Sequence, residues 1–254
     1  MELFILGSGS FKPARHPQAV RNPTGLAVRL KKDLIFFDLG FGNVWQLARC
    51  GLRTQSATDV FLTHRHPDHS GDLAALLFHL RYDSPPQSGR LRLWGPKGTI
   101  AFVKRLRRTF LPWLEPQHYR LEVRELRDGK TARGSGWRVD CLHAPHPTPA
   151  LSYRLSAAGK SLVISGDSGP NPPFARFAAG CDTLLLEAGL ESNAKAPVHL
   201  NAQQAVDLAC SIAPRQTIFY HLTEASAKEL RALLKSHRGL RGRVAADLMR
   251  VRIG

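Results

Sequence analysis

A short segment of the chain, residues 62–72, concentrates side chains that bind metal ions. It reads LTHRHPDHSGD, and six consecutive positions contain His64, His66, Asp68 and His69. In an extended segment, residues two apart project to the same side, so His64 and His66 can reach one ion. Pro67 restricts the turn that follows, and Asp68 and His69 then point from the start of a helix toward a neighbouring position. Imidazole and carboxylate groups suit zinc, manganese and iron.

Four such groups are too many for one tight tetrahedral ion, which indicates two adjacent ions. The alternative is a solvated, His-rich loop, but this spacing between a strand and a Gly-Asp helix start is rarely met by chance. Further candidate ligands follow apolar strands later in the chain: His143 or His146, Asp167 and His221. A water between two cations loses a proton near neutral pH and becomes a hydroxide nucleophile. The pattern therefore predicts hydrolysis of a phosphodiester or another ester.

The elements that must position these residues alternate along the chain. Strands are predicted at residues 3–6, 25–30, 33–40, 59–63, 90–95, 119–125, 136–142, 151–156, 161–165, 182–187 and 216–220. Helices are predicted at residues 42–51, 71–81, 97–109, 172–179, 201–212 and 224–236. Two halves, each with strands and covering helices, predict an α+β fold of four layers, an αββα sandwich. The length and the lack of a long linker predict a single domain over residues 1–254.

The composition is strongly basic, with 36 Lys and Arg residues against 20 Asp and Glu residues and a formal net charge of +16. Residues 90–108 and residues 231–252 hold seven Lys or Arg residues each. Such a field attracts an anionic partner such as nucleic acid, in a salt-dependent way, and the alternative is a merely solvated surface. The scattered cysteines, the lack of a membrane-length apolar run and an acid at position 2 predict a cytoplasmic protein without a membrane partner or a signal peptide.

The segment THRHPDHSGDL resembles the His-x-His-x-Asp-His signature of the metallo-β-lactamase superfamily. Residues 6–47, with an Asp-x-Gly turn at Asp38 and Gly40, resemble the opening strands of its ribonuclease Z-like branch, and HPTPALSYRL, SGDSGP and YHLTE resemble later segments. The resemblance implies the metallo-β-lactamase fold and favours His146 over His143. It implies one zinc ion on His64, His66 and His146, a second on Asp68, His69 and His221, and Asp167 as a bridge. Manganese and iron are alternatives to zinc.

The segment HLNAQQA, residues 199–205, resembles a helix start whose histidine assists catalysis in ribonuclease Z. His199 is therefore a candidate proton donor to the leaving group, and Asp68 is a candidate for orienting the attacking hydroxide. The alternative for His199 is a helix-start residue without a chemical role. The leading prediction is a di-zinc phosphodiesterase of the ribonuclease Z-like type, acting on RNA or on a small nucleotide or cyclic phosphodiester through a metal-bound hydroxide. The alternatives are a hydrolase of another ester, thioester or lactone, and a non-catalytic metal-binding relative.

Two departures from ribonuclease Z bear on the substrate. The basic arm that grips transfer RNA in that enzyme follows the YRL strand, where this chain has only the short hairpin SAAGKS at residues 156–161. The acid that orients its catalytic histidine precedes the bridging aspartate, where this chain reads LVIS, and Glu187 in LLLEAG is the candidate substitute. Both departures argue against transfer-RNA processing, while the basic surface keeps nucleic acid among the substrates. Dimers are common in this branch, so the resemblance also implies a homodimer.

Overall fold

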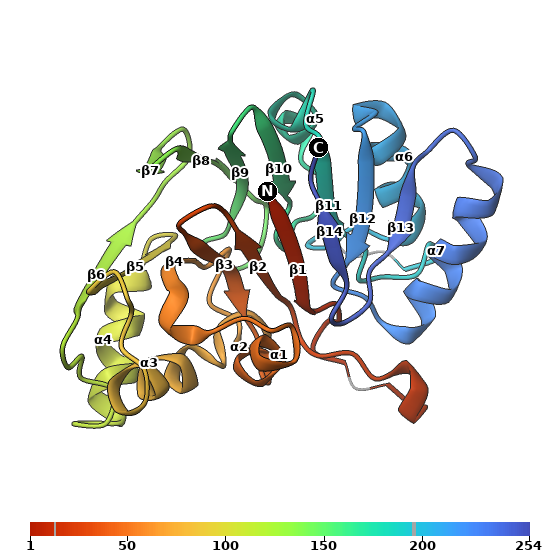
Figure 1. The fold of residues 1–254 in the computed structure, drawn as a ribbon. Coiled ribbons are helices and arrows are strands. Elements are labelled where there is room, and N and C mark those ends of the chain that lie inside the picture. Colours follow the sequence, from red (N-terminus) through yellow and green to blue (C-terminus); the bar gives the residue numbers. More distant parts are fainter. Residues whose placement is uncertain (13, 195–196) are drawn as a thin grey trace.

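The computed structural model describes residues 1–12, 14–194 and 197–254, and it contains two seven-stranded sheets packed face to face (Figure 1). The first sheet has the order β14 (Arg250–Arg252), β1 (Glu2–Gly7), β2 (Gly25–Arg29), β3 (Leu34–Leu39), β4 (Ala57–Phe61), β5 (Arg90–Gly95) and β6 (Arg120–Glu125). The second sheet has the order β13 (Gly242–Val244), β12 (Gln216–Tyr220), β11 (Thr183–Glu187), β10 (Lys160–Ile164), β9 (Leu151–Ala157), β8 (Trp137–His143) and β7 (Thr131–Gly134).

Helices cover the outer face of each sheet. The first sheet carries α1 (Asn43–Arg49), α3 (Leu73–Tyr82) and α4 (Thr99–Thr109), and the one-turn helix α2 (Pro67–Ser70) lies between β4 and α3. The second sheet carries α5 (Pro172–Ala178), α6 (Ala202–Ile212) and α7 (Glu224–Ser236). The described residues also form two short 3-10 helices, η1 (Pro17–Ala19) and η2 (Thr54–Ser56). The predicted four-layer αββα sandwich is confirmed.

Side chains alternate along each strand between the core that joins the sheets and the cores beneath the helices. Phe37 faces the opposite sheet, whereas its neighbour Phe36 faces the helices, as the two-residue period of a strand requires. Phe61 lies at the centre of the inner core, with its ring centroid 5.2 Å from that of Phe37 and 5.8 Å from that of Trp94. It also meets Tyr153 of the second sheet edge-on at 5.4 Å. Phe61 thus packs the two sheets together.

Each predicted strand and helix is present, with ends that differ by at most two residues. Three strands were not predicted: β7, β13 and β14. They are three or four residues long and read TARG, GRV and RVR, too short and polar to show an alternating pattern. All three lie at sheet edges, where pairing with one neighbour forms the strand. Their formation therefore depends on the neighbouring strand more than on their own side chains.

Parallel strand pairing brings the predicted site segments to one edge of the sandwich. Strands β3 to β6 are parallel to one another, and so are β10 to β13. The carboxyl ends of parallel strands meet at the same edge of a sheet, where sites commonly form. The predicted ligands follow β4, β8, β10 and β12, so they reach this edge from both sheets.

No helix in the described ranges has both the length and the apolarity that a bilayer crossing requires. The cytoplasmic location, the single-domain organisation and the homodimer stay predictions.

Replacing Phe61 by alanine should lower the free energy of unfolding by about 3–5 kcal/mol, because a buried ring between the sheets is lost and a cavity remains. Urea unfolding followed by circular dichroism measures this change. The control is Trp45→Ala, since Trp45 is 73% exposed on α1 and its loss should change stability by less than about 0.5 kcal/mol. Equal effects of the two substitutions would show that the inner aromatic cluster does not hold the sheets together.

Candidate metal centre

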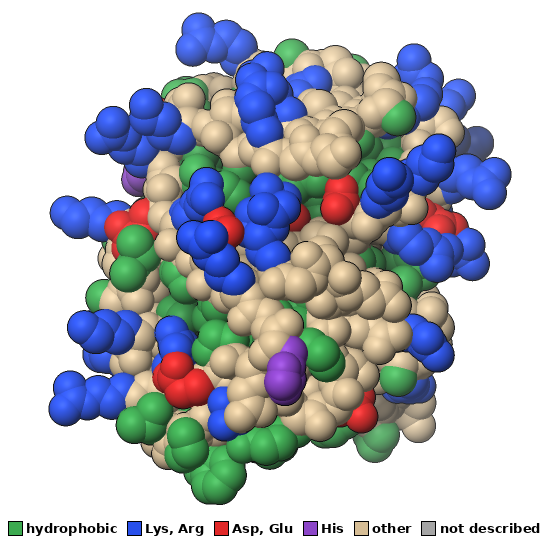
Figure 2. Space-filling view, turned by 60° about the vertical axis from the view of Figure 1, so that its left-hand side comes forward, with side chains coloured by type: hydrophobic (Ala, Val, Ile, Leu, Met, Phe, Trp, Pro, Cys, Tyr) green, Lys and Arg blue, Asp and Glu red, His purple; other side chains and the backbone are tan. Residues whose placement is uncertain are grey.

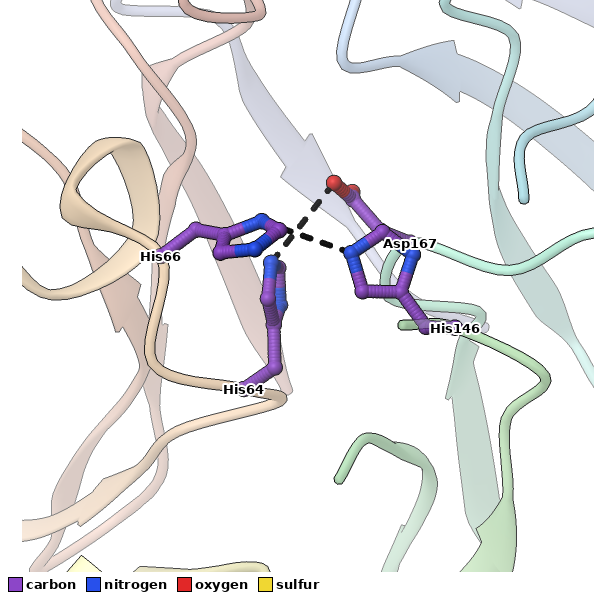
Figure 3. A group of neighbouring side chains, drawn as sticks. All are labelled: His64, His66, His146 and Asp167. Carbon is purple, nitrogen blue, oxygen red and sulfur yellow. Dashed lines mark hydrogen bonds and ion pairs between the residues drawn. The ribbon is translucent and has the colours of Figure 1, made fainter. Parts of the chain in front are cut away.

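Four of the predicted ligands converge on one point between the sheets, as Figure 3 shows. His64 and His66 project from the loop after β4, His146 from the loop after β8, and Asp167 from the loop after β10. Nδ1 of His66 lies 3.3 Å from Nε2 of His146. Nε2 of His64 lies 3.7 Å from Oδ2 of Asp167. His143, the alternative to His146, is exposed at the end of β8 and lies outside this group.

A second group, formed by Asp68, His69 and His221, adjoins the first and shares Asp167 with it. Nε2 of His69 lies 3.3 Å from Oδ1 of Asp167, and Nε2 of His221 lies 3.3 Å from Oδ2. Nε2 of His221 also lies 3.5 Å from Oδ2 of Asp68. Ligand atoms around a tetrahedral ion with bonds of ~2.0–2.1 Å are about 3.3 Å apart. The spacing of both groups is therefore that of side chains able to surround a cation.

The buried ligand atoms of this centre lack partners within the described parts of the chain. Nε2 of His64, His69 and His221 and Oδ1 of Asp167 are inaccessible to solvent and make no hydrogen bond there. Almost all buried polar atoms in proteins have a partner, so four such atoms facing the same space need an explanation. A divalent metal ion supplies it, because neutral imidazole and carboxylate are its usual ligands. The residues thus fit divalent metal binding.

The electrostatics of the centre favour added positive charge. Burial lowers the pKa of His64 well below its usual value, which keeps the ring in the neutral form that ligation requires. Burial alone would raise the pKa of Asp167, but His221 and His69 outweigh it and hold this pKa well below its usual value. Burial alone would lower the pKa of His69, but Asp167 and Asp38 outweigh it and raise this pKa well above its usual value. The two carboxylates therefore stabilise positive charge at His69, and a metal ion on its Nε2 would take the place of the proton there.

Asp38 orients His69 from behind. Its Oδ2 accepts a hydrogen bond from Nδ1 of His69 at 2.8 Å, and its two oxygens also accept from the backbone N–H and the hydroxyl of Thr63, each at 2.7 Å. A proton on Nδ1 leaves Nε2 of His69 as the nitrogen that faces the centre. Two residues later, a Cβ on Gly40 would lie 2.2 Å from the carbonyl oxygen of Asp68. The Asp-x-Gly turn thus places the carboxylate of Asp38 behind His69, and its glycine, Gly40, lets the backbone pass close to that of Asp68.

His199 lies at the rim of the centre, with its ring stacked on that of His221 at 5.4 Å. Its Nδ1 donates to Oε1 of Glu187 at 2.9 Å, and Glu187 also accepts from the backbone N–H groups of Ser168 at 3.0 Å and Gly189 at 3.1 Å. Burial lowers the pKa of His199, but the hydrogen bond and charge of Glu187 outweigh it and raise this pKa above its usual value. Glu187, the predicted substitute for the missing acid, therefore holds a proton on His199.

The family model described as Beta-lactamase superfamily domain matches residues 35–222, which include every candidate ligand. The chain belongs to this family. Ribonuclease Z from Shouchella clausii (strain KSM-K16) is 25% identical to it over 285 residues, which cover 90% of this chain and 88% of that protein. The predicted family is therefore confirmed by a match that spans most of the chain.

Solved structures confirm the metallo-β-lactamase fold. YhfI from Bacillus subtilis, a metallo-β-lactamase fold protein, aligns with a TM-score of 0.82 and 17% identity over 98% of each chain. Human tRNase Z, short form, aligns with a TM-score of 0.79 and 21% identity over 100% of each chain. At these identities the likeness establishes the arrangement of sheets and helices, whereas the chemistry of the site depends on this chain's own residues.

Asp38→Asn should weaken metal binding about 10–100-fold, because the amide keeps the shape of the carboxylate but removes the charge behind His69. Competition with a chelator, followed by elemental analysis, measures the affinity. Asp83→Asn is the control, since the Asp83 side chain is 65% exposed and pairs with His79, outside the centre. If both variants bind metal as the parent does, Asp38 does not support ligation by His69.

Proposed function

We propose that this metal-dependent hydrolase uses two ions to cleave phosphodiester bonds, with RNA as its substrate class. The observation that carries the proposal is the position of Asp167, whose carboxylate oxygens lie 3.3 Å from Nε2 of His69 and from Nε2 of His221 and 3.7 Å from Nε2 of His64. One carboxylate between two ligand groups is the arrangement of two-metal sites that act on phosphate esters. The ribonuclease Z relative supports RNA as the substrate.

We assign His64, His66 and His146 to one ion, Asp68, His69 and His221 to the other, and Asp167 to both. Zinc suits these nitrogen-rich sets best, and manganese or iron would also fit them. When bound, the pair would supply Lewis acidity toward the phosphoryl oxygens and a hydroxide nucleophile at neutral pH.

Side chains of the protein would carry out the remaining steps, the two proton transfers. Oδ2 of Asp68 lies 3.5 Å from Nε2 of His221, and the second oxygen of this carboxylate would accept a proton from the attacking water. His199 holds its Nδ1 proton against Glu187, so Nε2 is the nitrogen that would donate a proton to the leaving oxygen. Glu187 acts through His199 and is a positioning residue.

The turn between β9 and β10 favours a second candidate substrate class. Only Ala158 and Gly159 separate these strands, so the short hairpin predicted at this place is present. No long basic arm lies at this position of the described chain. A small nucleotide or cyclic phosphodiester needs no such arm, which makes these compounds the second candidate.

The proposal is tested by Asp167→Ala, with bis(p-nitrophenyl) phosphate as substrate and elemental analysis of the protein. The parent should hold two ions per chain and turn over the substrate, whereas the variant should hold one or none and be inactive, because both ligand groups lose a shared member. Asp207→Ala, at an exposed position of α6, is the matched control. Two tightly held ions in the Asp167 variant, or an inactive two-ion parent, would overturn the proposal.

His199→Ala should slow cleavage of RNA about 10²–10⁴-fold, because the ribose leaving oxygen needs a proton. The same variant should hydrolyse bis(p-nitrophenyl) phosphate nearly as fast as the parent, since p-nitrophenolate leaves without one. Glu187→Gln should also slow the cleavage of RNA more than the hydrolysis of bis(p-nitrophenyl) phosphate, but by a smaller factor than His199→Ala. Equal losses with both substrates would contradict proton donation by His199 and indicate a structural role.

A further inference from the structure

Exposed aromatic and aliphatic side chains gather where α3 and α4 end. Phe78 and Tyr82 project from successive turns of α3, are 49% and 50% exposed, and have ring centroids 4.9 Å apart. The ring of Trp113, 54% exposed after α4, lies 6.3 Å from that of Tyr82. Phe110 and Leu111 are exposed beside it, and these five residues are named the aromatic platform. Figure 2, which brings this end of the molecule forward, shows hydrophobic side chains gathered along its lower margin.

Cationic side chains border the aromatic platform. The guanidinium carbon of Arg81 lies 5.2 Å from the ring centre of Tyr82. Lys104 and Arg108 are four residues apart on α4 and share one exposed face, with Arg105 next to them. Within the described residues, no ion pair joins Lys104, Arg105 or Arg108 to an acidic side chain. The helix therefore presents uncompensated positive charge beside flat aromatic rings.

Helix α4 connects the candidate metal centre with the aromatic platform. Arg65 lies between two of the candidate ligands, and its Nη1 donates to the carbonyl oxygen of Lys97 at 2.5 Å. Lys97 is exposed just before α4, whose length corresponds to roughly 16 Å. Exposed cations thus lead from the metal-binding loop along α4 to the platform.

The two cations of β14, at the end of the second basic segment, do not form an equivalent path. Arg250 on β14 is paired with Glu2, and Arg252 lies opposite Glu2 at the start of β1. The metal centre lies at the other edge, near the end of β1, where the carbonyl oxygen of Ser8 accepts from the backbone N–H of Leu222. The charge of β14 is therefore remote from the centre.

We propose that the aromatic platform and the exposed cations of α4 bind single-stranded RNA that extends from the metal centre. The inference rests on the proposed function and adds the surface that holds the substrate. Bases stack on exposed aromatic rings whatever their sequence, and neighbouring cations neutralise the phosphates. A second copy of this chain is the less favourable occupant, because a symmetric contact would bring the same uncompensated cations of α4 together.

Binding is measured by fluorescence anisotropy with the metal-loaded protein and a labelled phosphorothioate RNA of about 12 nucleotides, which resists cleavage. Trp113→Ala should weaken binding about tenfold, because one stacked base loses its ring. Trp113→Phe keeps a ring and should bind within about twofold of the parent. The kcat/KM for bis(p-nitrophenyl) phosphate should be unchanged in both variants, because this small substrate does not reach the platform.

A matched pair of lysines tests the charged part of the surface. Lys104→Ala should weaken RNA binding and reduce the slope of log affinity against log salt by ~0.7, the value for one phosphate contact to a single strand. Lys32→Ala removes the same exposed charge from the β2–β3 turn, at the edge opposite the metal centre, and should change neither quantity.

The outcomes separate this surface from the proposed function. Unchanged RNA binding by Trp113→Ala and Lys104→Ala in an active enzyme would overturn the surface and leave the phosphodiesterase standing. Platform-dependent RNA binding by a parent that hydrolyses nothing would support the surface and overturn the phosphodiesterase. A Trp113→Ala variant whose mass in sedimentation falls, while its RNA binding stays unchanged, would make the platform a contact between copies and overturn RNA binding there.

Discussion

The buried carboxylate of Asp167 is the constraint on which the site depends. Asp167 is 2% exposed, and removing an ionised group from water is unfavourable unless positive partners compensate it. His69 and His221 face it at 3.3 Å from two different sheets. Both sheets must therefore present strand ends at the same edge, and the parallel pairing of β3 to β6 and of β10 to β13 provides this. Asp38 then fixes the ring of His69 that Asp167 requires.

Local sequence patterns were sufficient to predict those parts of the site whose residues are close together in the sequence. The spacing of His64, His66, Asp68 and His69 predicted a shared site because one continuous segment, the loop after β4 and helix α2, places all four. Spacing alone did not separate His146 from His143, since His143 ends β8 and His146 follows only three residues later, and the path of the loop after β8 decides which ring faces inward. The pairing of His199 with Glu187 was less accessible to prediction, because the path between β11 and α6 sets it.

Net charge predicted an anionic partner but not the surface that meets it. Arg92 belongs to the basic segment 90–108, yet its charge is paired within the fold. It binds the fully buried carboxylate of Asp59 and lies over the ring of Trp137 at 5.2 Å. Arg250 is likewise paired with Glu2. The sequence does not distinguish such paired residues from unpaired cations, whereas the fold shows that Lys104, Arg105 and Arg108 on α4 make no ion pair within the described residues.

Glu187 has a consequence that reaches beyond the orientation of one histidine. It binds the backbone N–H of Ser168, which directly follows Asp167, and it binds Nδ1 of His199. The loop that carries the shared carboxylate and the ring at the rim are therefore mechanically joined through one buried side chain. A displacement of that loop would change the contacts of Glu187 and, through them, the support of His199. The position of the shared metal ligand and that of the proton donor thus depend on the same buried carboxylate, so a change at Glu187 would alter both.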